Sequence, residues 1–180
     1  MKHYAAFPIM EREIIENKQL TALVKNLQII SAALIMGVLF FAVMTLLLVD
    51  WEHVSAKLTP LGLLALALPL VLGAISLFLP SMLFKQAASA YARENPKPEI
   101  ASLLRASGVA ATTQTIVGMS LREGGALLGL AAWFLESNLL GLIGMFIGLG
   151  LMILTFPTYG KIEQKLADFR EEVKSQQRNA

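Results

Sequence analysis

The chain has 180 residues, of which 56% are hydrophobic and 16% are charged, with a formal net charge of +2 and no cysteine. A soluble globular domain carries roughly a quarter charged residues, so this composition argues against a soluble protein and favours a membrane protein. The lack of cysteine excludes disulfides and thiolate metal sites.

The chain begins with a mixed-charge segment, residues 1–25, in which Met10, Ile14 and Leu20 are among apolar residues at mostly helical spacing. The first apolar run after this segment is too long for the core of a secretory signal, so we expect the first membrane helix to be retained. The spacing predicts an interfacial helix that runs into the membrane. A solvated helical extension is the alternative.

Long apolar runs predict the membrane helices, because a helix needs about 20 apolar residues to cross a hydrocarbon core of roughly 30 Å. Apart from Arg122 and Glu123, which have to be tolerated in the third run, the runs are uncharged. They predict helices at about residues 26–49, 58–84, 115–135 and 138–157. We therefore expect an all-α fold: a four-helix transmembrane bundle, residues 26–160, with cytoplasmic helical extensions.

The second predicted helix contains prolines with two different roles. Thr59 and Pro60 are typical of a helix start, with an N-cap residue followed by proline at the first helical position. Pro69 and Pro80 fall inside the helix, where each removes a backbone hydrogen bond, and Pro80 thereby frees the carbonyl of Ser76. This pattern predicts a packing kink, and a hinge is the alternative.

The clearest break in the chain is ENPKPEI, residues 94–100. Pro98 suits a helix start. The third helix therefore begins in the cytoplasm and enters the membrane without interruption, or a short separate interfacial helix precedes it.

The turn ESN joins the third and fourth helices so closely that they are antiparallel neighbours. Counted outward from Ser137, Gly125 comes next to Gly148 and Gly129 comes next to Gly144. Small residues four apart allow two membrane helices to approach closely. We predict that all four glycines line the contact between these two helices.

Residues 161–180 form a charged segment with one apolar stripe. Ile162, Leu166, Phe169 and Val173 are spaced by four, three and four residues, as on one face of an amphipathic helix. Two heptads are too few for an independent coiled coil, so we expect this cytoplasmic helix to pack on its own chain.

The distribution of basic residues predicts the orientation. Four Lys and Arg residues precede the first membrane helix, four lie between the second and third, and five follow the fourth, whereas the other two connections hold only Lys57. Short loops rich in Lys and Arg stay cytoplasmic, so both termini are predicted to be cytoplasmic. Trp51 and Trp133 fall at the predicted outer ends, where headgroup-level aromatic residues are common.

Arg122 and Glu123 form a candidate polar site inside the membrane. Neighbouring residues differ by about 100° around a helix, so the two side chains cannot face each other and each needs another partner. We predict that Arg122 faces the fourth helix or the free Ser76 carbonyl, and that Glu123 meets a hydroxyl, Ser31 or Thr155. Alternatively, both charges mark a membrane boundary, with Arg122 reaching the inner headgroups.

The sequence predicts no catalytic, metal or cofactor site. DWEHV contains three potential metal ligands, but near neighbours at a helix end point in different directions. His3 and His53 are the only imidazole bases, and the sequence has no phosphate-binding loop, dinucleotide fingerprint or nucleic-acid motif. We therefore expect no enzyme activity, no cofactor and no nucleic-acid partner.

The segment LREGGALLGLAAWFLESN, followed by a glycine-rich helix and FPTYGKIEQKL, resembles a group of small uncharacterised bacterial integral membrane proteins with four helices. Members are similar in an acidic residue followed by a small one, a short polar turn, and a Pro-Thr boundary. Glu123-Gly124, Ser137-Asn138 and Pro157-Thr158 match these places. The resemblance covers the end of the chain and implies no particular activity.

These observations favour a non-enzymatic integral protein of the cell inner (plasma) membrane. Its predicted surroundings are the lipid bilayer and either further copies of itself or a larger membrane complex, so that it acts as a scaffold, accessory subunit or small oligomer. The alternative is a dimeric ion- or proton-coupled transporter with Glu123 as the titrating group. Transport needs a water-accessible cavity at Glu123, whereas a structural role needs a paired and sealed carboxylate.

Overall fold

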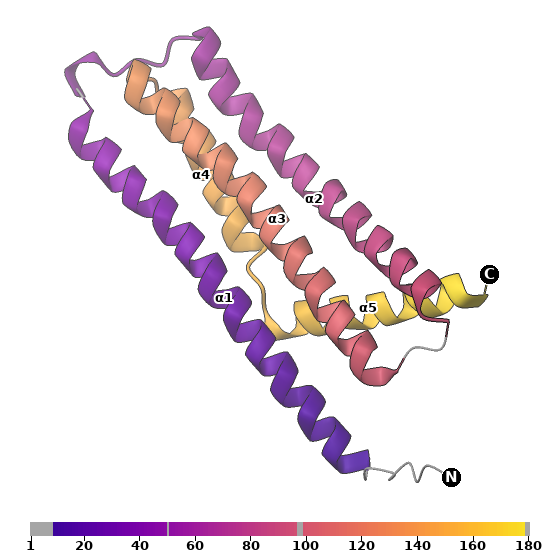
Figure 1. Ribbon diagram of the computed structural model, residues 1–180. Helices are drawn as coiled ribbons and strands as arrows, with labels where there is room; N and C mark the ends of the chain where they lie inside the picture. The colour runs from indigo at the N-terminus through magenta and orange to yellow at the C-terminus, as the bar shows by residue number, and fades with distance from the viewer. Residues whose placement is uncertain (1–8, 50, 97–98, 179–180) are drawn as a thin grey trace, which may run out of the picture.

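The computed structural model describes the backbone of residues 9–49, 51–96 and 99–178, and the side chains from residue 18 onward within these ranges. The described chain is all-α (Figure 1). The elements are α1 (Ile9–Leu48), the short 3-10 helix η1 (Trp51–His53), α2 (Pro60–Glu94), α3 (Ile100–Glu136), α4 (Leu139–Leu154) and α5 (Tyr159–Arg178). The side chains of Met10 and Ile14, and the predicted helix start at Pro98, lie outside this description.

Three helices extend well beyond the predicted membrane segments. α1 begins at Ile9 rather than near residue 26, α2 continues to Glu94 rather than to residue 84, and α3 begins at Ile100 rather than near residue 115. The polar residues that flank these apolar runs include no helix-breaking proline, so the helices continue through them. Of the two alternatives for α3, the structure contains the single uninterrupted helix.

α4 ends at Leu154 rather than near residue 157. The residue before a proline is disfavoured in the helical conformation, so Pro157 stops α4 early. α5 then starts at Tyr159, and the two helices meet at an angle of 71°.

By length and composition, α1 and α2 can each cross a membrane, and a third span is present if the bent pair α4 and α5 counts as one. α3 is less apolar because it contains Arg122 and Glu123, and α4 alone has only 16 residues. Large apolar side chains nevertheless cover the outside of the molecule. On α1 and α2 the most exposed of them are Ile29, Met36, Phe40, Leu47, Leu48, Leu77, Phe78 and Met82. A surface of this kind is suited to lipid rather than water.

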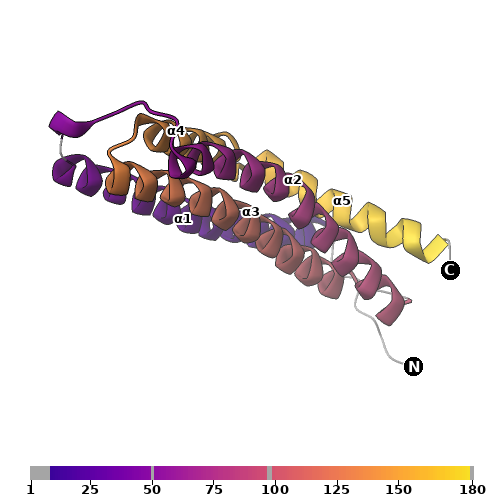
Figure 2. The same cartoon turned by 90° about the horizontal axis from the view of Figure 1, so that it is seen from above.

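α3 is the central helix of the bundle (Figure 1). It contacts each of the other four helices, whereas α1 and α2 lie on its two flanks and make no contact with each other within the described residues. α4 packs against both α3 and α2, and α5 runs beside the last turns of α2 (Figure 2).

The two ends of the bundle differ in character. One end, here called the turn end, contains residues 51–59 and the turn between α3 and α4 (Figure 1). The other, the basic end, contains the start of α1, the end of α2, the start of α3 and all of α5. The connections predicted to be rich in Lys and Arg therefore lie at one end.

The apolar stripe of α5 is buried against its own chain. Ile162 and Leu166 pack with residues of α1 and α3, while Phe169 and Val173 pack with residues of α2 and α3. The Phe169 ring lies edge to face with Phe84 of α2, at a centroid distance of 5.5 Å. This packing holds α5 beneath α2 and α3.

Glycines allow the close approach of α4 to its neighbours. A Cβ built at Gly129 of α3 would lie 2.5 Å from the Met145 nitrogen of α4, and one at Gly148 would lie 2.8 Å from the Ala126 nitrogen of α3. These two glycines lie in the predicted contact.

Gly125 and Gly144 instead face α2. A Cβ at Gly125 would lie 2.9 Å from the Pro69 Cα, and one at Gly144 would clash with the Ala65 carbonyl oxygen. The Gly144 backbone also contacts α3, since its carbonyl carbon would lie 3.0 Å from a Cβ at Gly129. The prediction that all four glycines line the contact between α3 and α4 therefore differs from the structure chiefly at Gly125, because α4 packs against both α3 and α2.

At the turn end, buried Asn138 ties three segments together. Its side-chain amide donates to the Lys57 carbonyl at 2.9 Å and to the Thr59 hydroxyl at 3.0 Å, while its side-chain oxygen accepts from the Leu140 nitrogen at 3.0 Å. The Thr59 hydroxyl in turn donates to the Glu136 carboxylate. The ESN turn therefore also fixes the start of α2.

The two tryptophans at this end have different environments. Trp51 is exposed, as expected for an aromatic residue at the headgroup level, but Trp133 is fully buried. The two rings pack edge to face with their centroids 5.7 Å apart. Trp133 is thus a core residue beneath Trp51 rather than a member of an interfacial belt.

We predict that Gly129→Ala destabilises the protein in detergent by about 1–3 kcal/mol, because the new methyl group has no space against the α4 backbone. Gly150→Ala is the matched control, since a Cβ at Gly150 meets no atom within 4 Å. Thermal unfolding of both variants measures the difference. Equal stability of the two would contradict close packing at Gly129.

We predict that Asn138→Asp loses about 1–3 kcal/mol of stability although it keeps the acceptor that caps α4. The substitution removes the amide donor to Lys57 and Thr59 and adds a negative charge near Glu136. The control is Asn26→Asp at an exposed position of α1. If thermal unfolding gives the same midpoint for Asn138→Asp as for the unsubstituted protein, the amide bonds contribute nothing.

Candidate functional site

Arg122 points from the middle of α3 into the protein and is only 7% exposed. Its Nη2 donates to the Ser76 carbonyl of α2 at 3.5 Å, a long bond. Pro80 has no N–H for that carbonyl, which leaves it free to accept. Gly118 leaves room for the guanidinium, since a Cβ there would lie 3.4 Å from Nη1. The structure therefore brings together Arg122 and Ser76, one of the two partners that the sequence predicted for Arg122.

Two lysines of α5 approach the same region. The Lys165 ammonium donates to the Thr115 hydroxyl of α3 at 3.1 Å. The Lys161 ammonium donates to the Leu154 and Phe156 carbonyls, at 3.0 Å and 3.2 Å, and so satisfies carbonyls left free at the end of α4. Arg122, Lys161 and Lys165 are called the cation cluster below.

The cluster perturbs the titration of Lys165. Burial first, and then the positive charges of Arg122 and Lys161, together lower the pKa of Lys165 to about 8. Packing of α5 and the bond to Thr115 hold Lys165 at this place although the neighbouring cations repel its charge. A bound anion would stabilise the charged form of Lys165.

A cavity of about 470 Å³ adjoins the cation cluster. It is lined from α2 by Ser76, Leu77, Pro80 and Ser81, from α3 by Gln114, Thr115, Gly118, Met119 and Arg122, and from α4 and α5 by Leu154, Thr155, Pro157, Lys161, Ile162, Gln164, Lys165 and Asp168. Among these described residues, Asp168 carries the one carboxylate. The cavity can therefore take an anion.

Glu123 lies on the side of α3 that faces α1. A Cβ built at Gly37 of α1 would lie 3.9 Å from its Oε1. Among the side chains that the structure describes, none donates a hydrogen bond to Glu123 or forms an ion pair with it. Ser31 is buried in α1, and the Thr155 hydroxyl donates to the Leu151 carbonyl at 2.6 Å.

The structure thus does not bring Glu123 to either predicted hydroxyl. Thr155 stands at the C-terminal end of α4, where carbonyls lack helical partners, so its hydroxyl is satisfied within its own helix. The predicted polar layer is present around Arg122 and not around Glu123.

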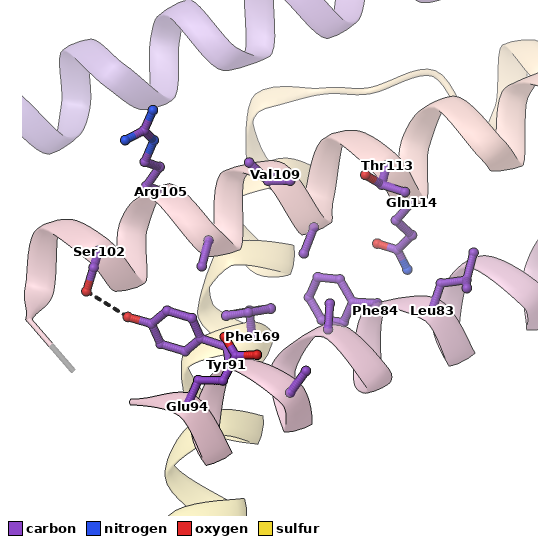
Figure 3. Close-up of a pocket in the computed structure, with 14 residues that line it drawn as sticks. Leu83, Phe84, Tyr91, Glu94, Ser102, Arg105, Val109, Thr113, Gln114 and Phe169 are labelled. Atoms are coloured by element: carbon purple, nitrogen blue, oxygen red, sulfur yellow. Dashed lines mark hydrogen bonds between the residues drawn. The ribbon is translucent and has the colours of Figure 1, made fainter. Parts of the chain in front are cut away.

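A second cavity, of about 480 Å³, lies between α2 and α3 at the basic end (Figure 3). Its walls are mostly apolar and include the rings of Phe84, Tyr91 and Phe169. The Tyr91 hydroxyl shares a hydrogen bond of 2.7 Å with Ser102, which joins the two helices, and Arg105 points away from the rings (Figure 3). This cavity presents few polar groups that could orient a ligand.

Comparison with known proteins assigns no family: no family model matches the chain, and no curated protein or solved structure matches it. The resemblance to small bacterial membrane proteins therefore stays a prediction.

Sequence reasoning identified Arg122 but missed the two lysines. Lys161 and Lys165 are four residues apart and hence on one face of α5, which was the available signal. Their position beside Arg122 depends on the bend after α4 and on the packing of α5 under α3, and neither can be read from local spacing.

We predict that Lys165 titrates with a midpoint of about 8 and that Arg122→Gln raises this midpoint, because removing a neighbouring positive charge favours the protonated amine. Lys161→Gln should raise it less. NMR of ¹³C-methylated lysines measures the titration, with Lys165→Arg identifying the signal. A midpoint that Arg122→Gln leaves unchanged would contradict the coupling, and Lys174→Gln on the exposed side of α5 is the control.

Proposed function

We propose that the chain is an integral inner-membrane protein in which all four of α1 to α4 cross the bilayer. α3 is flanked at the same level by α1 and α2, the two described helices that are each long and apolar enough to cross a membrane (Figure 1), and this supports its insertion. α4 is roughly 24 Å long by its helical rise, and residues 155–158, which join it to α5, complete the crossing. α5, charged on one face and buried on the other, lies at the inner surface.

The clustering of basic residues supports an orientation with the basic end in the cytoplasm. The loops that hold Lys and Arg gather at that end, and Lys57 lies at the turn end. Both termini are then cytoplasmic, and η1 and the ESN turn face outward.

The observation that carries the proposed role is a face of small residues on α3 that its own chain leaves uncovered. Ser120, Gly124 and Ala131 lie on one side of the helix; Ser120 and Ala131 are exposed, and a Cβ at Gly124 would meet no atom within 4 Å. Small residues four apart favour helix association in lipid. We infer that the protein is a non-enzymatic small oligomer or accessory subunit that associates through this face.

A second candidate is proton- or ion-coupled transport, favoured by the unpaired carboxylate of Glu123. An ionisable residue inside the membrane with no partner is a functional candidate by default. Neither of the two cavities described above is lined by Glu123. Proton flux into liposomes that Glu123→Gln abolishes would favour transport over the accessory role.

For the orientation, we predict that a cysteine at exposed Ala56 is labelled by an impermeant thiol reagent on intact cells, and that one at exposed Ser175 is labelled only after permeabilisation. The chain has no native cysteine, so each signal comes from the introduced residue. The reverse labelling pattern would overturn the orientation.

For the association, we predict that Gly124→Ile lowers the oligomeric fraction in liposomes, because a branched side chain keeps the partner helix at a distance. Single-molecule photobleaching measures the number of copies. Gly150→Ile introduces the same side chain at another open position and should leave the fraction unchanged. A protein that is monomeric before substitution, or an equal response of both variants, would contradict association through α3.

A further inference from the structure

The cation cluster gathers more positive charge than its surroundings neutralise. Among the described residues, none of Arg122, Lys161 and Lys165 has an ion-pair partner. Asp168, the one carboxylate on the described wall, is exposed on α5. Three cations beside one exposed carboxylate leave a net positive site at the base of the bundle. Like charges in a partly buried site repel one another strongly unless an anion accompanies them.

The cluster also retains unused hydrogen-bond donors. The Arg122 guanidinium has five N–H groups and makes only its long bond to Ser76. The Lys165 ammonium has three and uses one, on Thr115. Guanidinium and ammonium donors that converge without acceptors suit an anion with several oxygens, and phosphate is the common ligand of this type.

The cavity that adjoins the cation cluster lies where the apolar surface of the bundle gives way to basic side chains. Exposed Leu77 and Leu154 line the same cavity as the cations, so its wall passes from apolar to basic at the point where α4 ends. A phospholipid matches this order, because its apolar acyl chains are followed by a negatively charged phosphate. Basic pockets between membrane helices on the cytoplasmic side bind anionic headgroups in other membrane proteins.

We propose that this cavity binds a phosphate group, that of an anionic phospholipid of the inner leaflet or of free phosphate, through Arg122 and Lys165, with Lys161 adding positive charge at its edge. The volume of about 470 Å³ accommodates a headgroup. This site is separate from the association face of α3 and does not depend on it.

The test uses the full chain in a neutral detergent, with lipid binding measured by native mass spectrometry. Phosphatidylglycerol should bind at least about tenfold more tightly than phosphatidylcholine, because charge-assisted bonds are stronger and choline repels the cluster. Arg122→Gln and Lys165→Gln should each reduce phosphatidylglycerol binding about tenfold. Lys174→Gln, an equal loss of charge on the exposed side of α5, should change it less than twofold.

A second arm replaces the lipid by inorganic phosphate and follows the shift in thermal unfolding. A shift that Lys165→Gln removes, together with competition against phosphatidylglycerol, assigns the site to free phosphate as well; lipid binding without that shift assigns it to the headgroup. Lys165→Gln keeps the test decisive if Arg122→Gln fails to fold. Binding of neither probe, or equal loss in the Lys174→Gln control, overturns the proposal.

Discussion

The arrangement of the chain depends on shielding Arg122 and Glu123, two charges in the middle of α3. In the proposed arrangement α3 crosses the membrane, and a charged side chain at the centre of a membrane helix costs roughly 2.5–3.5 kcal/mol on insertion scales, and more if it faces lipid directly. α3 contacts the other four helices, while α1 and α2, whose apolar runs carry no charge, lie on its flanks and carry much of the exposed apolar surface. Gly129 and Gly148 then allow α4 to close the remaining side at backbone distance.

The break in the helix at Pro157 determines the arrangement of the basic end. Because α4 stops at Leu154 and the chain turns by 71°, α5 passes under α2 and α3 instead of leaving the bundle. Its apolar stripe fixes the rotation of the helix, and that rotation directs Lys165 to Thr115, close to Arg122. The packing of Phe169 and Ile162 therefore determines where the Lys165 charge lies, because both depend on the rotation of α5 about its axis.

The positions of the apolar helices and the buried face of α5 follow from local residue patterns and could be predicted from the sequence. Contacts that depend on how one helix packs against two others could not. Run length indicated the apolar helices, and the spacing of Ile162 to Val173 indicated the buried face of α5. Counting from the ESN turn fixed the depth of Gly125 and Gly144 but not their rotation, so it could not show that they face α2. The hydroxyl of Thr155 was available to Glu123 by depth alone, yet the carbonyls at the end of α4 lie closer to it.

Neighbours on a helix differ by about 100°, so α3 necessarily directs Arg122 and Glu123 into different surroundings. Arg122 reaches α2 and the cavity beside α5, whereas Glu123 faces Gly37 on α1. α1 makes no contact with α2 within the described residues and packs instead against α3, α4 and α5. The adjacent charges are neighbours in sequence but face different helices of the bundle.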